Sequence, residues 1–175
     1  MRENVKTSPE PFSVRRFEAR DREAVLALWP ADIMHPQPGL ESIDVLINSV
    51  AGAIAGTQQL WVADASGRII GSAAVIHHNS SQAHLRCLCV AHDVPERQIV
   101  ARSLAERAIT DAWERGYLKL VVHTNSPPSR LAAELHHLGF EFSREHSRDG
   151  EHVLEFYQNL YERPRPSSLP EGQSL

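Results

Sequence analysis

The chain has 175 residues, 42% of them hydrophobic and 23% charged, with a formal net charge of −4, which predicts one globular domain. It contains only two lysines and no Lys/Arg run longer than two residues, which argues against a nucleic-acid-binding surface. No apolar run reaches membrane-spanning length and the N-terminus lacks a signal peptide's apolar core, so we expect a cytoplasmic protein.

In chain order, residues 1–11 are polar with two prolines, and we expect them to be disordered. The alternation of residues 12–17 predicts a first strand. Asp21 is a suitable N-cap for a first helix that Pro30 would end. Apolar residues at steps of three and four predict a second helix over residues 40–54.

Residues 59–65 and 68–77 predict a hairpin across a Ser-Gly turn. The central strand follows over residues 84–90, and after a turn comes a long amphipathic helix that Gly116 closes. Residues 118–124 predict a strand that a right-handed crossover would place parallel to the central strand.

The remaining segments complete the domain. Ser126 and Pro127 open a last helix, and Gly139 stops it. Residues 141–145 and 153–157 predict a last hairpin, which is also an edge for a possible homodimer. Residues 162–175 form a Pro/Ser-rich tail, so the sequence predicts a single domain over residues 12–161 between disordered ends.

The segment 83–116 resembles the central motif of the GNAT superfamily, the acyl-CoA-dependent N-acyltransferases. In that family a strand ending in an apolar-Val step, here Cys89-Val90, precedes the loop (Arg/Gln)-x-x-Gly-x-(Gly/Ala), here residues 96–101. Leu138-Gly139-Phe140 matches a second family segment, and the element order over 12–161 is the family's. The resemblance implies an α/β fold: a mixed, mostly antiparallel sheet with a parallel central pair and helices on both faces.

The resemblance further implies an N-acyltransferase that moves an acyl group, most simply acetyl from acetyl-CoA, to an amine of a small molecule or a peptide. The backbone at the end of the central strand would contact the acyl-pantetheine, the loop and helix start would surround the pyrophosphate, and two later side chains would contact the cofactor arm. These positions are Leu88, Cys89 and Val90; Arg97, Gln98, Ile99, Val100, Ala101 and Arg102; and Asn125 and Ser129. A loop and helix cap is the competing interpretation of Asn125. No metal site is expected.

Three positions depart from the family pattern. Glu96 stands where the family has Arg or Gln, Ile99 replaces the central Gly, and Leu135 replaces the Tyr that protonates the departing thiolate. Asp93 to Glu96 also fits a capping box that would start the helix early and reshape the phosphate cradle. The alternative hypothesis is therefore a GNAT-fold binding or regulatory module with weak or no catalysis, and an unrelated α/β domain of the same element order is a third.

His84 is the candidate general base, because imidazole titrates near neutral pH. Its Ala-His-Leu context resembles the arylalkylamine branch of the family, where histidines on this strand relay protons. A buried structural histidine is the competing interpretation. Strand alternation would place His84, Arg86 and Leu88 on one face and Leu85, Cys87 and Cys89 on the other. We expect the two cysteines to be reduced core residues, and His123, His136 or His137 to be possible substitutes for the missing acid.

Overall fold

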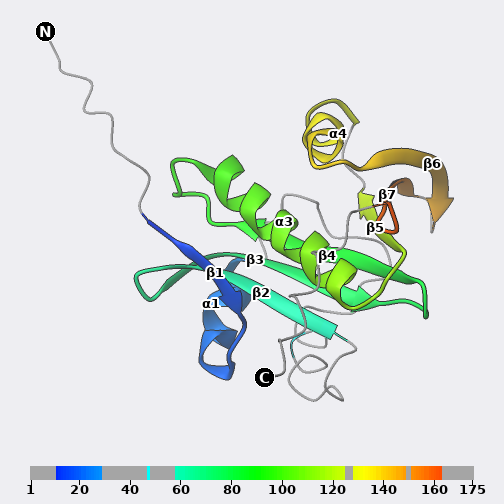
Figure 1. Cartoon of the computed structure of the whole chain (residues 1–175). Helices are drawn as coiled ribbons and strands as arrows, with labels where there is room; N and C mark the ends of the chain where they lie inside the picture. Colours follow the sequence, from blue (N-terminus) through cyan, green and yellow to red (C-terminus); the bar gives the residue numbers. More distant parts are fainter. Residues whose placement is uncertain (1–10, 29–46, 48–57, 125–127, 149–150, 163–175) are drawn as a thin grey trace, which may run out of the picture.

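The structure is a computed structural model that describes residues 11–28, 47, 58–124, 128–148 and 151–162 (Figure 1). Seven strands form one sheet: β1 Ser13–Arg16, β2 Gln58–Ala65, β3 Arg68–His77, β4 Gln82–Val90, β5 Lys119–Thr124, β6 Glu141–Arg148 and β7 Glu151–Asn159. The helices are η1 Ala19–Asp21 (3-10), α1 Arg22–Leu28, α3 Arg97–Glu114 and α4 Pro128–His137. No helix in this part of the chain has the length and apolar character needed to cross a bilayer.

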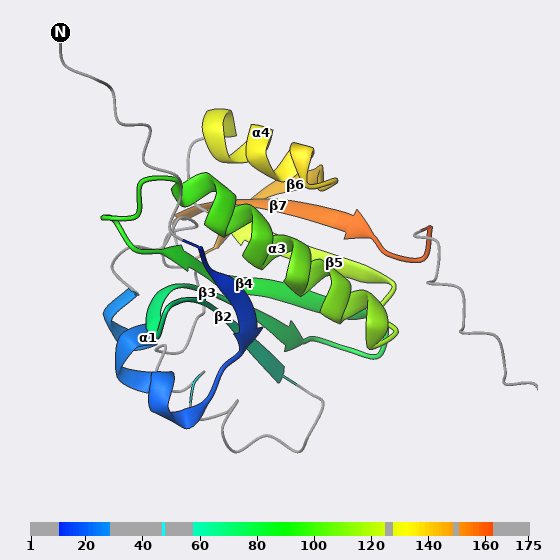
Figure 2. The same cartoon turned by 60° about the vertical axis from the view of Figure 1, so that its left-hand side comes forward.

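The strand order is β1-β2-β3-β4-β5-β7-β6, and every neighbouring pair is antiparallel except β4 and β5. Helix α3 connects that parallel pair. It lies with α4 on one face of the sheet, and α1 lies on the other (Figures 1 and 2). The predicted fold class, a mostly antiparallel sheet with a parallel central pair and helices on both faces, is therefore confirmed.

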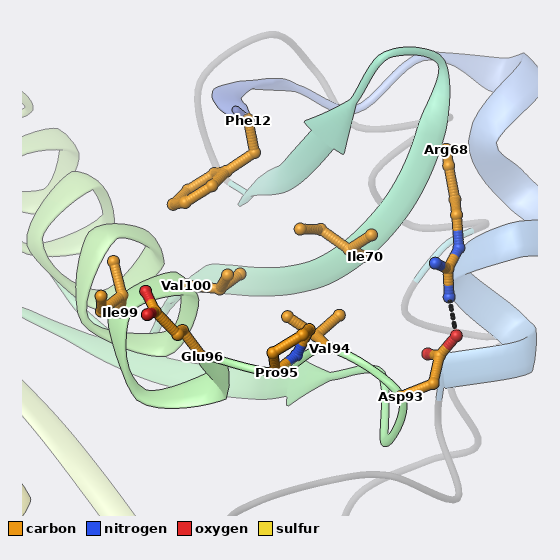
Figure 3. A pocket seen from close by; sticks show the side chains of 9 residues that line it. All are labelled: Phe12, Arg68, Ile70, Asp93, Val94, Pro95, Glu96, Ile99 and Val100. Carbon is orange, nitrogen blue, oxygen red and sulfur yellow. Dashed lines mark hydrogen bonds and ion pairs between the residues drawn. The ribbon is translucent and has the colours of Figure 1, made fainter. Parts of the chain in front are cut away.

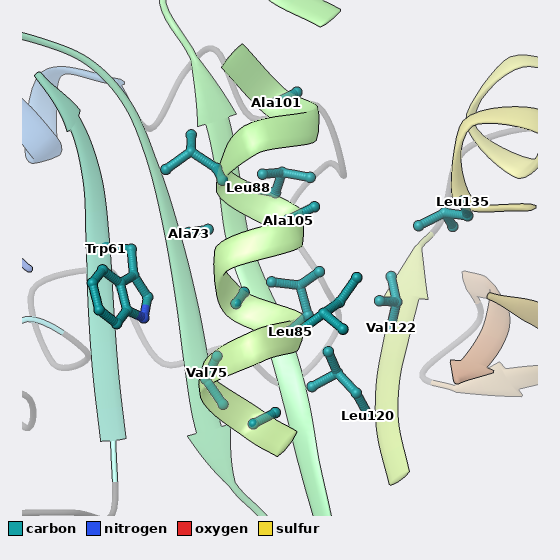
Figure 4. Packing of buried hydrophobic residues seen from close by; sticks show 14 of the residues in the cluster. Trp61, Ala73, Val75, Leu85, Leu88, Ala101, Ala105, Leu120, Val122 and Leu135 are labelled. Atoms are coloured by element: carbon teal, nitrogen blue, oxygen red, sulfur yellow. The ribbon is translucent and has the colours of Figure 1, made fainter. Parts of the chain in front are cut away.

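Helix α3 packs closely on the sheet because its inner face is rich in alanine (Figure 4). Leu104, Ala105 and Ala108 are fully buried in the cluster that also holds Leu85 of β4. Gly71 of β3 permits this approach, since a Cβ there would lie 2.8 Å from Leu104 Cδ1 and 2.9 Å from the Cys89 carbonyl oxygen. The close contact fixes α3 over the end of β4.

Several predicted boundaries agree with the structure, among them both ends of β3, and Gly116 and Gly139 adopt positive φ after their helices. Asp21 is not an N-cap but is the last residue of the 3-10 turn. Its carboxylate accepts a hydrogen bond from the Glu18 N–H at 2.8 Å and a bidentate pair of bonds from the Arg15 guanidinium. The last hairpin is longer than predicted. The predicted second helix, residues 40–54, lies outside the described residues except for Ile47, which is helical and buried.

A bulge in β4 changes which side chains share a face. The register with β3 shifts between Ser72 and Ala74, Cys87 takes a φ of 54°, and its carbonyl accepts the Ser72 hydroxyl at 3.1 Å. Leu88 therefore packs with Leu85 against α3, and the prediction that it shares a face with His84 is wrong. Cys87 and Cys89 do share a face, and both are buried without a disulfide, as predicted.

Candidate active site

The parallel strands β4 and β5 separate soon after they meet. They pair at three positions, the last being His84 with Val121, yet β4 continues to Val90 and β5 to Thr124. Beyond this point β5 pairs only with β7 in the described part of the chain. The edge of β4 from Leu85 to Val90 is thus not covered by β5, and an extended ligand can hydrogen-bond to such an edge.

Helix α3 begins close to this open edge. Glu96 is its N-cap and makes no side-chain capping bond, and the Ile99 and Val100 amides already donate to the Glu96 carbonyl at 3.0 and 3.4 Å. The amides of Arg97 and Gln98 come before the first intrahelical bonds, so they are available to an anion at the helix end. The Ile99 side chain, 49% exposed, stands at the same end.

The prediction that Asp93 caps an early helix start is wrong. Its carboxylate forms an ion pair with Arg68 of β3 (Figure 3), whereas the helix begins only at Arg97. Next to this ion pair is a small pocket of about 90 Å³, lined by Phe12, Arg68, Ile70, Asp93, Val94, Pro95, Glu96, Ile99 and Val100. The residues before the helix are thereby left as a loop, as in the family pattern.

The predicted cofactor side chains differ in where they point. Arg97 donates to the Val90 carbonyl oxygen at 3.0 Å, and its Nε is buried with no partner among the described residues. Gln98 donates to Glu134 of α4 at 3.1 Å, whereas Arg102 is exposed and pairs with Glu106.

The other predicted cofactor positions offer less to a ligand. The side chains of Val100 and Ala101 face the core, so only their backbone is available. The position of Asn125 and the side chain of Ser129 lie outside the described residues.

On the face of the sheet opposite α3, four histidines lie in a row, which we call the histidine row: His78, His84, His123 and His146. The rings of His78 and His84 stack at 4.6 Å, His84 and His123 meet edge to face at 5.2 Å, and His123 and His146 at 6.0 Å. The row crosses the sheet where β4 leaves β5. Among the described residues, no group of three or more His, Cys, Asp or Glu is placed to hold a metal ion.

His84 is the predicted base and is 9% exposed. Its Nε2 lies 3.1 Å from the Gln82 side-chain amide, and its Nδ1 lies 3.5 Å from an Arg86 nitrogen. Burial, followed by the nearby His123, Arg86 and His78, lowers the pKa of His84 from 6.5 to about 3. The ring is therefore neutral at pH 7.

His123 of β5 has a different environment. Its Nε2 lies 3.2 Å from the Glu155 carboxylate, which also accepts a bond from Arg144 at 3.1 Å. Burial lowers the pKa of His123 below 6.5, and the bond to Glu155 opposes that shift. Burial would raise the pKa of Glu155, but bonds from His123, Ser143 and Arg144 outweigh it and hold that pKa below its ordinary value.

Sequence reasoning found part of this arrangement. It named His84 as a base and His123 only as a substitute acid, and it missed Glu155. One signal was present: alternation puts Leu120 and Val122 on one face of β5 and Val121 and His123 on the other, so His123 points away from the core cluster that holds Leu120 and Val122. The other two proposed acids, His136 and His137, are exposed on α4, and Leu135 is buried in the core.

Comparison with known proteins agrees with this geometry. The family model described as acetyltransferase (GNAT) domain matches residues 37–154, more than half of the chain. The chain therefore belongs to the GNAT acetyltransferase family. No curated protein sequence matches it.

Solved structures share the fold at low identity. A putative acetyltransferase from Salmonella typhimurium, solved with acetyl-CoA, is 17% identical, covers 91% of this chain and 99% of its own, and has a TM-score of 0.68. The ribosomal-protein-S18-alanine N-acetyltransferase from Escherichia coli is 16% identical with the same coverage and a TM-score of 0.69. The aminoglycoside 6'-acetyltransferase type Ii is 13% identical, with coverage of 88% and 99% and a TM-score of 0.67.

Proposed function

We propose that the chain is an N-acetyltransferase that moves an acetyl group from acetyl-CoA to an amine of a small molecule or a peptide. The observation that carries this proposal is the edge of β4 from Leu85 to Val90, which β5 leaves uncovered and which leads to the amide-bearing start of α3. Such an edge suits an extended pantetheine arm, and such a helix start suits a pyrophosphate.

The residues at this place fit acetyl-CoA as co-substrate. The backbone of Leu88, Cys89 and Val90 would hold the acyl-pantetheine. Arg97 would bind the pyrophosphate, because its guanidinium contacts the end of β4 and has one buried nitrogen that no described residue pairs with. Two features weaken the cradle relative to the family: the negative charge of Glu96 and the Cβ of Ile99.

The proposed acceptor class rests on the family and on the polar face of the sheet. The solved relatives are named for amine acceptors of both kinds, an aminoglycoside and a ribosomal-protein alanine. The incoming amine must lose a proton before it attacks. We place that step on the histidine row, where His84, the base predicted from sequence, lies beside the separation of β4 and β5.

The test is isothermal titration of the chain with acetyl-CoA, followed by an amine screen that measures thiol release. We expect a Kd of about 1–100 µM. Arg97→Ala should weaken binding by roughly tenfold or more, since it removes a charge-assisted phosphate contact. Arg102→Ala is the matched control, because Arg102 is exposed and paired with Glu106, and its affinity should stay close to that of the unmodified chain.

One result would overturn the proposal, and a second would overturn the role of Arg97 within it. If the unmodified chain bound no acetyl-CoA, the alternative of a GNAT-fold binding or regulatory module would replace it. If Arg97→Ala and Arg102→Ala weakened binding equally, Arg97 would have no specific role in holding the phosphates.

A further inference from the structure

One ring of the histidine row, that of His123, has its tautomer fixed by a carboxylate, that of Glu155. Glu155 can only accept, so the hydrogen between it and His123 belongs to His123 Nε2. In the neutral ring the lone pair must then lie on Nδ1. The contact therefore fixes a single tautomer and leaves Nδ1 as the one basic atom of His123.

His84 has the opposite arrangement. An arginine side chain donates and cannot accept, so His84 Nδ1, which faces Arg86, must carry the lone pair of the neutral ring. Its Nε2–H then faces the Gln82 side-chain amide, whose oxygen can accept it after a flip. The only basic atom of His84 thus points at a permanent positive charge, where an added proton is disfavoured.

We infer that His123, oriented by Glu155, is the base that takes the proton of the acceptor amine, and that His84 stays neutral beside it. This inference rests on the proposed acetyl transfer and names the group that performs one of its steps. It assigns a catalytic role to His123 and a positioning role to Glu155.

The location of His123 supports this role. It lies on β5 two residues beyond the last pair with β4, and 18% of its side chain is exposed. The groups that face it from the described elements are His84 and Arg86 of β4, Glu155 of β7, and Arg144 and His146 of β6. Glu155 is the only anion among them, so it is the group that stabilises an imidazolium at this position.

The step balances without any other reagent. His123 Nδ1 takes one proton from the substrate ammonium, directly or through one water. The neutral amine forms the C–N bond to the thioester carbonyl, the C–S bond breaks, and the second amine proton passes to the departing sulfur. His123 then releases its proton to solvent, which its partial exposure allows.

The experiment is the pH dependence of kcat/KM for the unmodified chain and four variants. In the unmodified chain kcat/KM should fall at low pH as the base becomes protonated, and we call this fall the acid limb. His123→Gln should lower kcat/KM by roughly 10²–10⁴-fold and remove the acid limb. Glu155→Gln should keep a limb but move it to lower pH, because it removes the charge that favours the imidazolium. His84→Gln should keep the limb in place. Glu145→Gln, which alters the exposed Glu145–His152 pair on the same hairpin, should change nothing.

A measurement without variants tests the same idea. Nitrogen-15 NMR of labelled histidine should show His123 as the Nε2–H tautomer at neutral pH. The Nδ1–H tautomer, or full activity and an unchanged acid limb in a folded His123→Gln variant, would overturn the inference while leaving the acetyl transfer intact. If the unmodified chain released no thiol with any amine in the panel, the proposed function would fail and the inference would fail with it.

Discussion

The two faces of the central strands have opposite chemistry although they share one backbone. Toward α3, strands β4, β5 and β7 place these side chains in the apolar core: Leu85, Leu88, Val90, Leu120, Val122, Leu154 and Phe156. Toward the other face, β4 presents His84 as well as the buried Cys87 and Cys89, and β5 and β7 present His123 and Glu155. Alternate residues of a strand point to opposite faces, so alternation encodes both faces in β5 and β7, whereas in β4 the bulge at Cys87 moves Leu88 to the face of Leu85.

The difference shows where stability and chemistry are located. The apolar face is buried against α3, and this burial is the main favourable term in folding. The polar face holds partly buried titratable groups, each of which needs a partner or must remain neutral. His84 remains neutral, and Glu155 keeps its charge through His123 and Arg144. The separation of β4 from β5 is open to both faces, and it is there that we propose that acetyl-CoA and the acceptor amine meet.

The largest effect should come from Leu85→Ala on the apolar face. Leu85 is fully buried, and removing its side chain should lower the free energy of unfolding by about 2–5 kcal/mol, through lost burial and the cavity left behind. Urea unfolding followed by circular dichroism measures this. Leu118→Ala is the control: Leu118 is 50% exposed and its loss should cost less than about 0.5 kcal/mol. Equal effects would mean that the apolar face does not dominate stability.

His84, the neighbour of Leu85 in the chain, points to the opposite face and should make the free energy of unfolding depend on pH. The folded-state pKa of His84, about 3, is below its ordinary 6.5, so the unfolded chain binds the proton more tightly. The contribution of this pKa difference to the free energy of unfolding is complete above pH 6.5 and is lost as the pH falls toward 3. Between pH 7 and 4 the unmodified chain should lose about 3 kcal/mol more than His84→Gln. Urea titrations at both pH values check this, and parallel losses would show that His84 titrates normally.

A smaller effect tests how tightly the apolar face is packed. Gly71→Ala places a methyl 2.9 Å from the Cys89 carbonyl oxygen, which belongs to the backbone and cannot rotate away. We expect a loss of about 1–3 kcal/mol in the free energy of unfolding. Gly67 has open space around its Cβ position but a φ of 94°, so Gly67→Ala isolates backbone strain from crowding. A stabilising Gly71→Ala would show that α3 can move outward freely.

Much of this fold could be predicted because its signals are local. The apolar alternation of β3, the helical spacing of α3 and the glycines after both helices all lie within a few residues of the boundaries they set. The parallel pairing of β4 and β5 followed from the intervening helix and the right-handed crossover rule. Resemblance to the GNAT motif then pointed to the backbone at the end of β4 as the part that would contact the cofactor.

The features that sequence reasoning missed depend on residues far apart in the chain. Asp93 satisfies a local capping rule, yet Arg68, 25 residues earlier, takes its carboxylate. The bulge at Cys87 depends on Ser72 of the neighbouring strand, and it reverses the face of Leu88. Glu155 becomes a partner of His123 only through the register of β5 with β7, which no local pattern specifies.

Ile99→Gly should give the smallest change in stability. It should also change the affinity for acetyl-CoA. Ile99 is 49% exposed in the first turn of α3, so glycine there should cost about 1 kcal/mol or less in the free energy of unfolding. It also removes the branched Cβ at the position where the family has glycine, so backbone can approach a phosphate more closely. Titration calorimetry should therefore show tighter acetyl-CoA binding than in the unmodified chain.

The same variant tests whether the two faces are independent. Ile99 lies at the start of α3, on the side where we place the cofactor, and the histidine row lies on the other face. Ile99→Gly should thus change the affinity for acetyl-CoA and leave the acid limb of kcat/KM where it is. A shift of that limb would mean that the helix start and the histidine row are coupled through the end of β4. Unchanged affinity would mean that the side chains around Arg97, rather than a close approach of backbone, hold the phosphates.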